Sequence, residues 1–213
     1  MSVNKKHPLA IHKNNKSDLL QKLENITGVP VKVKEDLPQL KLRSVFFLLD
    51  CSGSMSSGNK LDYAKNGGIE YAMDANSKGY KIGLISFGSS AKIILGIQDD
   101  IECFKKQILK IEIEGSTNLT DAIRIAREKF LFNRGERVIF IVTDGCPDDP
   151  DSAINEAKLA IHSGIEIMTL GTDDANINFL NSIASKKEFS KKVNSQYLHQ
   201  AIKDMSKLLP GGN

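Results

Sequence analysis

Three oxygen-bearing side chains follow the most apolar run of the chain at every second position. Residues 45–49 read Val-Phe-Phe-Leu-Leu, and Asp50, Ser52 and Ser54 come after them. Because an extended or turning backbone places alternate side chains on the same side, these three can converge on one point. Mg²⁺ binds oxygen atoms, about six of them in an octahedron at about 2.0–2.1 Å. The pattern therefore favours a hard divalent cation held at the end of a strand.

Two later segments supply further oxygen ligands. Gly115-Ser116-Thr117 contributes another hydroxyl, and Thr143-Asp144-Gly145 contributes another carboxylate. Any one of these residues could instead serve only to end a strand, cap a helix or form a turn, so the metal-site prediction depends on the whole set. The candidate metal ligands are Asp50, Ser52, Ser54, Thr117 and Asp144.

Strands and helices are expected to alternate from about residue 40 onward. Apolar and β-branched runs predict strands at residues 44–50, 81–87, 91–97, 137–143 and 166–170, with a short strand around 189–191. Helical spacing of apolar residues predicts helices at 60–77, 101–109, 119–132, 151–163, 176–184 and 196–208. The gap at residues 88–90 is too short for a parallel crossover, so the strands on either side of it must be antiparallel.

This order of elements predicts an α/β fold. We expect a Rossmann-like, doubly wound, mostly parallel six-stranded sheet with one antiparallel edge strand and helices on both faces. In such sheets, ligands bind outside the carboxyl ends of the strands. Asp50 and Asp144 each end a predicted strand at that edge, so the fold and the candidate site agree.

The length and composition fit one main domain. The chain has 213 residues, of which 40% are hydrophobic, enough for one substantial core. We expect a main domain over residues 40–209, a short C-terminal tail over 210–213, and a basic N-terminal tail over 1–39. In that N-terminal tail, Ser17 could cap a short helix, and residues 29–39, with two prolines, form an extended lead-in.

Charge and cysteine content limit the choice of partners and compartment. The formal net charge is +3, and residues 1–40 carry seven lysines against four acidic residues. Since there is no arginine-rich stripe with interleaved aromatics, we expect no nucleic-acid binding. Cys51, Cys103 and Cys146 are few and without CxxC spacing, which is typical of a reducing compartment. With no apolar run of about 20 residues and no signal-peptide pattern, a cytoplasmic protein that does not enter a membrane is expected.

The candidate ligands resemble a known constellation. The pattern Asp50-Cys51-Ser52-Gly53-Ser54, followed by Thr117 and by Asp144 in a Thr-Asp-Gly stretch, is similar to the metal-ion-dependent adhesion site of von Willebrand factor A domains, here of the bacterial, stand-alone type. The similarity covers roughly residues 40–209. It implies that Ser52 and Ser54 bind the metal directly and that Asp50 acts through bound water. Thr117 and Asp144 would alternate between direct and water-mediated contact.

The resemblance implies a function in binding. The protein would be a non-enzymatic, Mg²⁺-dependent protein-binding module, an adaptor or scaffold, with Mn²⁺ or Ca²⁺ as substitutes for Mg²⁺. A partner protein would supply an Asp or Glu to the metal. Because few of the ligands are anionic, the metal would keep much of its charge and could accept that carboxylate.

Two other functions stay open at this point. One is a Mg²⁺-dependent phosphohydrolase of the haloacid dehalogenase type. These enzymes use D-x-D, whereas this chain has Ser52 in the place of the second Asp, and a serine cannot do that residue's proton transfer. The other is a regulatory subunit of a larger AAA+ ATPase or chelatase-like complex, which the sequence does not distinguish from a free adaptor.

Neighbours of the candidate ligands have simpler interpretations. Asp149 or Asp151 is expected to cap the next helix, with Pro150 in its first turn. Cys51 and Cys146 each stand close to a candidate ligand in the sequence. They could form a redox-sensitive pair, but two small buried or turn residues are the favoured interpretation.

Overall fold

The computed structural model describes residues 42–131, 133 and 135–210. The helix expected after Ser17 and the extended lead-in of residues 29–39 lie outside the described residues. The strands are β1 (Leu42–Asp50), β2 (Tyr80–Phe87), β3 (Ala91–Gln98), β4 (Gly135–Thr143), β5 (Glu166–Thr172) and β6 (Ser190–Val193). The helices are α2 (Lys60–Ser77), α3 (Ile101–Ile108), α4 (Leu119–Lys129), α5 (Pro150–His162), α6 (Ile177–Ile183) and α7 (Leu198–Met205).

The strands of the described residues form a six-stranded sheet in the order β3-β2-β1-β4-β5-β6. β3 pairs antiparallel with β2 at one edge, and every other neighbouring pair is parallel. The predicted fold class, including the antiparallel edge strand, is therefore confirmed. β1 lies at the centre, where its side chains are buried from Ser44 onward because both faces of the sheet are covered.

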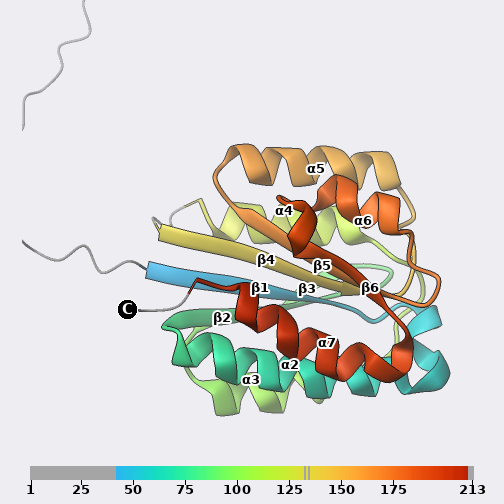
Figure 1. The fold of residues 1–213 in the computed structure, drawn as a ribbon, viewed down its shortest axis with the longest axis horizontal. Coiled ribbons are helices and arrows are strands. Elements are labelled where there is room, and N and C mark those ends of the chain that lie inside the picture. Colours follow the sequence, from blue (N-terminus) through green and yellow to red (C-terminus); the bar gives the residue numbers. More distant parts are fainter. Residues whose placement is uncertain (1–41, 132, 134, 211–213) are drawn as a thin grey trace, which may run out of the picture. The chain divides into compact units, whose positions relative to one another are not determined.

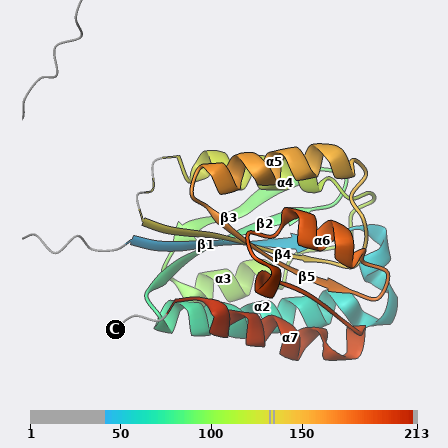
Figure 2. The ribbon, with the colours of Figure 1, turned by 45° about the horizontal axis from the view of Figure 1, so that its top comes forward.

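Helices cover both faces of the sheet (Figures 1 and 2). α2, α3 and α7 lie on one face, and α4, α5 and α6 lie on the other. Successive residues of β1 point to opposite faces, so Phe47 and Leu49 join the first cluster and Phe46 and Leu48 the second. Each face of the sheet therefore has its own apolar core.

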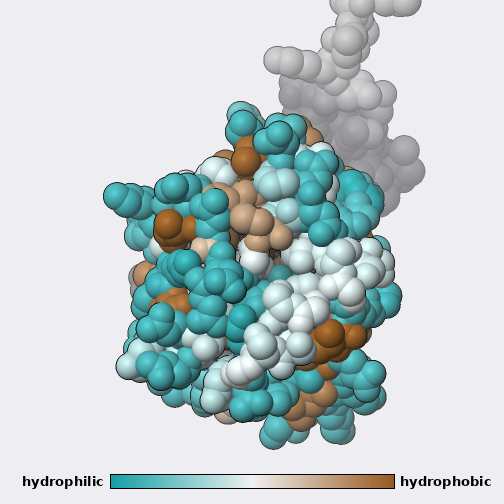
Figure 3. Space-filling model, turned by 90° about the vertical axis from the view of Figure 1, so that its right-hand side faces the viewer, coloured by the Kyte–Doolittle hydropathy of each residue, from teal (hydrophilic) through white to brown (hydrophobic). Residues whose placement is uncertain are grey.

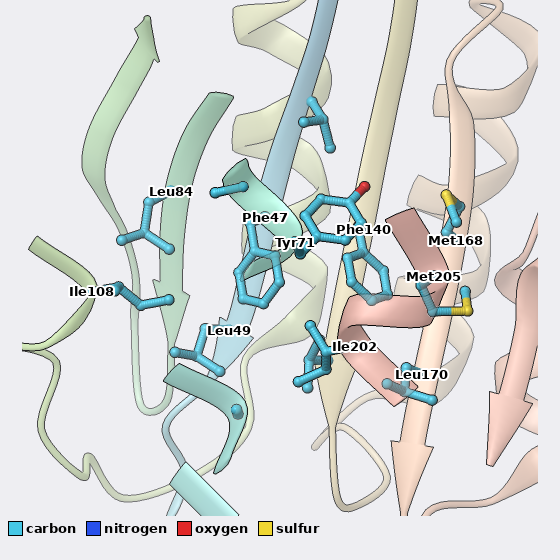
Figure 4. Close-up of a cluster of buried hydrophobic side chains, with 14 of the residues drawn as sticks. Phe47, Leu49, Tyr71, Leu84, Ile108, Phe140, Met168, Leu170, Ile202 and Met205 are labelled. Carbon is cyan, nitrogen blue, oxygen red and sulfur yellow. The ribbon is translucent and has the colours of Figure 1, made fainter. Parts of the chain in front are cut away.

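The core under α2 is built around aromatic rings. Figure 4 shows Phe47, Tyr71 and Phe140 lying together at its centre. The ring centroids of Tyr71 and Phe140 are 4.7 Å apart, and those of Phe47 and Phe140 are 5.4 Å apart. Such edge and tilted contacts stabilise a core beyond the area they bury. This cluster fixes α2 against the sheet.

Two adjacent glycines bring α2 close to its neighbours. A Cβ on Gly68 would lie 3.0 Å from the Phe47 ring, and a Cβ on Gly67 would lie 2.8 Å from the backbone oxygen of His199 in α7. A Cβ at either position would have to displace these neighbours, so glycine allows a closer approach than any other residue. α2 is thus held tightly between the sheet and α7, which fixes the position of its first residue, Lys60.

Some predicted boundaries are wrong. The helix expected to reach residue 132 ends at Lys129, where the backbone tightens and Leu131 N–H donates to the Glu128 carbonyl three residues back; residue 132 itself lies outside the described residues. The last helix is also shorter than predicted, with 3₁₀ turns at Ser195–Tyr197 and Ser206–Leu208 on either side of α7. Throughout the described part of the chain, each helix is too short or too polar to cross a lipid bilayer.

Candidate metal centre

The predicted ligands gather at the carboxyl edge of the parallel strands. Asp50 is the last residue of β1, and Asp144 directly follows the last residue of β4, the strand that pairs with β1. Figure 3 views this edge of the molecule, where a pale band of intermediate hydropathy crosses a largely hydrophilic face. Serine, threonine and glycine are residues of that intermediate kind, and the loops at this edge are rich in them.

A chain of hydrogen bonds joins four of the five predicted ligands. Asp50 accepts from the backbone N–H of Ser52 at 2.8 Å through Oδ1. The hydroxyls of Ser52 and Ser54 lie 3.1 Å apart, and the Ser54 hydroxyl donates to Asp144 Oδ1 at 2.6 Å. Asp50, Ser52 and Asp144 are buried, whereas Ser54 is exposed. The four side chains therefore form one cluster that opens to solvent at Ser54.

The loop of Thr117 reaches the same edge through its backbone. Gly53 N–H donates to the Gly115 carbonyl at 2.9 Å, which ties this loop to the Ser52 turn. Thr117 and Asp148 exchange two bonds, both 3.1 Å long, from Asp148 N–H to the Thr117 carbonyl and from Thr117 N–H to the Asp148 carboxylate. Within the described residues, no hydrogen bond joins the Thr117 hydroxyl itself to the other four side chains.

Asp50 carries a buried charge. Among the described residues no ion pair neutralises it; it accepts hydrogen bonds from Ser52, through the backbone N–H and the side chain, and from the Thr143 hydroxyl. Burial raises the pKa of Asp50 to about 6, an effect that these hydrogen bonds offset only in part and that the nearby charge of Asp144 adds to. The carboxylate is thus held in a site that would favour an additional positive charge.

Lys60 is a component of the site that the sequence analysis missed. Its ammonium lies 2.8 Å from Asp144 Oδ2 and 3.3 Å from a carboxylate oxygen of Asp173, just after β5. Burial disfavours the charged form, but the hydrogen bonds and charges of Asp144 and Asp173 outweigh it and raise the pKa of Lys60. A lysine at the first residue of a helix opposes the helix dipole, and that unfavourable position was the signal available in the sequence.

The donor set suits a hard divalent cation. It consists of two carboxylates and three hydroxyls, and so of oxygen atoms alone. No group of three or more His, Cys, Asp or Glu side chains within the described ranges is arranged to hold a metal ion. A metal at this edge would therefore depend on the serine and threonine hydroxyls as well as on Asp50 and Asp144.

The neighbouring residues have structural roles. Asp149 caps α5 by accepting from the Ser152 N–H at 3.0 Å, as predicted. Cys51 is buried and Cys146 is exposed, and both are free thiols. Burial, together with the charges of Glu114 and Asp50, raises the pKa of Cys51 to about 11. Because the thiolate is the reactive form, Cys51 is poorly suited to redox chemistry.

Comparison with known proteins agrees with this geometry. Residues 45–147, which include every candidate ligand, match the family described as von Willebrand factor type A domain. The chain contains a von Willebrand factor type A domain. This A domain is 26% identical over 185 residues to the human collagen alpha-6(VI) chain, a match that covers 75% of this chain and 8% of the collagen chain. The chain thus spans only a small part of that relative.

Solved structures of other proteins share the fold. The A domain matches proximal thread matrix protein 1 of the mussel byssus with a TM-score of 0.69 at 24% identity, over 78% of this chain and 45% of that one. That structure is described as having a zinc-occupied MIDAS motif. The vWF domain of the type V pili tip protein Mfa5 from Porphyromonas gingivalis matches with a TM-score of 0.73 at 15% identity, over 79% of this chain and 95% of that one.

Proposed function

We propose that this A domain is a non-enzymatic, Mg²⁺-dependent protein-binding module. A cation held by Asp50, Ser52, Ser54, Thr117 and Asp144 would accept an Asp or Glu side chain of a partner protein. The observation that carries the proposal is the hydrogen-bonded cluster of two buried carboxylates and two serine hydroxyls at the open edge of the sheet. Mn²⁺ or Ca²⁺ could replace Mg²⁺, since both also bind oxygen ligands.

The chemistry of the cluster supports binding over catalysis. In a phosphohydrolase of the D-x-D type, the second acid transfers a proton, and here that position is Ser52, whose hydroxyl lies 3.1 Å from that of Ser54. Neutral hydroxyls leave most of the charge on a bound cation, which can then attract a further carboxylate. This chain supplies the oxygen ligands and orients them, and the partner would complete the shell.

The comparisons support the same function. One matched relative is a collagen chain, one solved neighbour is a matrix protein of the mussel byssus with zinc in its MIDAS motif, and another is a pilus tip protein. We extend to this chain the metal-dependent site named for the byssus protein. That the metal in the cell is Mg²⁺, and that the domain binds a partner protein, are both part of this proposal.

Affinity capture with matched variants tests this function. We expect immobilised wild-type protein to retain a partner in Mg²⁺ and to release it in EDTA. Asp144→Ala should retain none, because it removes one of the two carboxylates of the cluster. Asp151→Ala is the matched control, since Asp151 is an exposed acid in the first turn of α5, and it should behave as wild type.

Experiments on the retained partner protein then distinguish a binding function from a catalytic one. We expect its binding to be lost when one of its own Asp or Glu residues is changed to the amide. Capture that EDTA leaves unchanged would contradict the proposal. So would Mg²⁺-dependent phosphatase turnover that Asp50→Ala abolishes.

Metal affinity should depend on pH through Asp50. Burial raises the pKa of Asp50 from 3.8 to about 6 in the folded protein. In the metal-free protein the contribution of this group to stability is therefore present at low pH and is lost as the pH rises from about 4 to about 6. A cation needs the ionised form, so its affinity should change in the opposite direction.

We expect the affinity for Mg²⁺ to rise by up to about tenfold between pH 5 and pH 6 and to level off above about pH 7. Calorimetric titration at several pH values measures this profile. An affinity that does not change with pH over this range would show that no proton is displaced from Asp50 on metal binding.

A further inference from the structure

Lys60 is a buried cation in direct contact with one of the candidate metal ligands, Asp144. Only 6% of its surface is exposed, and buried lysines are rare unless they are paired. Its ammonium touches two carboxylates, those of Asp144 and Asp173. These come from the loops after β4 and β5, so Lys60 joins three segments that are distant in the sequence.

The backbone holds Lys60 in this position. The preceding residues, Gly58 and Asn59, have φ values of 61° and 57°, in the left-handed region that few residues adopt. Met55, in the same turn, is fully buried. The two glycines of α2 fix the helix that Lys60 begins. The turn before Lys60 and the packed helix α2 therefore fix the side chain where its ammonium meets Asp144. Lys60 is not a freely moving lysine on the surface.

The two oxygens of Asp144 have different partners. Oδ1 accepts from the hydroxyl of Ser54 at 2.6 Å and so faces the serine cluster, whereas Oδ2 accepts from Lys60 at 2.8 Å. A cation bound by the serines and Lys60 would thus act on the same carboxylate from opposite sides. Like charges at such short range repel, so each should weaken the hold of the other on Asp144.

We propose that Lys60 is a positioning residue that shares Asp144 with the bound divalent cation. It orients the carboxylate so that one oxygen faces the serines, and it neutralises part of the negative charge of the site. The cation is then held less tightly and keeps more charge for the carboxylate of a partner. This inference rests on the proposed function, because it concerns the same metal.

Replacing Lys60 by methionine tests the charge-sharing directly. Lys60→Met keeps a long side chain without the charge, and Lys65→Met makes the same change at a partly exposed position of α2. We expect Lys60→Met to bind Mn²⁺ about tenfold more tightly than wild type, in a calorimetric or paramagnetic titration, because a competing charge is gone. Lys65→Met should match wild type, and Lys60→Arg, which keeps the charge, should stay within about threefold of it.

Asp173→Asn is a second variant with the opposite expected effect. Asparagine tolerates the left-handed φ of 47° at this position, and its side-chain oxygen can still accept from the Ser195 N–H, as Asp173 does at 3.0 Å. With one anionic partner lost, the Lys60 ammonium interacts more strongly with the Asp144 carboxylate. We therefore expect Mn²⁺ to bind about threefold more weakly. In a Lys60→Met background the same change should alter the affinity by less than about twofold.

The outcomes separate this inference from the function on which it rests. If wild type binds no Mn²⁺, both the proposed function and the role of Lys60 are wrong. If wild type binds Mn²⁺ and folded Lys60→Met binds it no more tightly, the role of Lys60 alone is wrong, since a purely structural residue would leave affinity unchanged or lower it. If Lys60→Met does not fold, Asp173→Asn decides, and an affinity equal to that of wild type would overturn the inference.

Discussion

An Asp50→Asn variant is expected to lose about 10–100-fold in affinity for Mg²⁺, while its metal-free form is more stable than wild type at pH 7. The two effects have one cause. Burial raises the pKa of Asp50 to about 6, so ionising it at pH 7 costs the folded protein free energy that the neutral amide does not cost. The stabilisation should be about 1–3 kcal/mol, which corresponds to an increase of about 2–12 °C in melting temperature.

The surroundings of Asp50 can accept the amide. The asparagine Oδ1 can still accept from the Ser52 N–H. Its NH₂ group would face the Thr143 hydroxyl, which now donates to Asp50 and lies 3.4 Å from the Gly145 carbonyl. Rotating that hydroxyl towards Gly145 lets it accept from the amide. The Ser52 N–H and the Thr143 hydroxyl thus both keep a partner in the variant.

Thermal unfolding with and without Mg²⁺, together with calorimetric titration, measures both effects. Asp151→Asn, on the exposed surface, should change neither the metal affinity nor the metal-free melting temperature. An Asp50→Asn variant that binds Mg²⁺ as wild type does would remove Asp50 from the site. A destabilised metal-free variant would mean that the buried charge is compensated in a way the hydrogen bonds of Asp50 do not account for.

Phe47→Ala is expected to lower the free energy of unfolding by about 3–5 kcal/mol. Phe47 is fully buried in β1 at the centre of the sheet. Its ring packs against those of Tyr71, Phe104 and Phe140, at centroid distances of 5.8, 6.3 and 5.4 Å. Removing the ring opens a cavity in a region where α2 and the sheet are already in close contact and relax little.

Urea unfolding followed by circular dichroism measures this loss. Tyr197→Ala serves as the control, because 58% of the surface of Tyr197 is exposed, and it should change the free energy of unfolding by less than about 0.5 kcal/mol. A loss of less than about 1 kcal/mol for Phe47→Ala would mean that the core closes over the missing ring, contrary to the tight packing described for α2.

Much of the fold follows from local patterns in the sequence. Helix α2 has the predicted bounds, residues 60–77, because its apolar spacing is regular and a glycine follows its end. The antiparallel pairing of β2 and β3 was predictable because three residues cannot make a parallel crossover. The length of α4 and the 3₁₀ turns around α7 were not predictable, since the choice between i→i+3 and i→i+4 bonds at a helix end depends on tertiary packing.

The candidate site, like the fold, was predictable from the sequence only in part. Asp50 and Asp144 could be placed at one edge because parallel strands carry their carboxyl ends to the same side. The loop of Thr117 could not be placed by periodicity, and its position depends on backbone bonds such as that from Gly53 to Gly115. Lys60 was predicted only as the start of a helix, because its contact with Asp144 joins residues 84 positions apart. No local pattern encodes such a contact.

The central claim is that one cation lies among five side chains from three segments of the chain. Crystals grown with Mn²⁺ and measured at an X-ray wavelength where manganese scatters anomalously test it most directly. We expect one strong anomalous peak at the carboxyl edge of the sheet, bounded by Ser52, Ser54, Thr117 and Asp144, with Asp50 beneath it. An ordered protein with no peak there, or with its manganese bound elsewhere, would contradict the account.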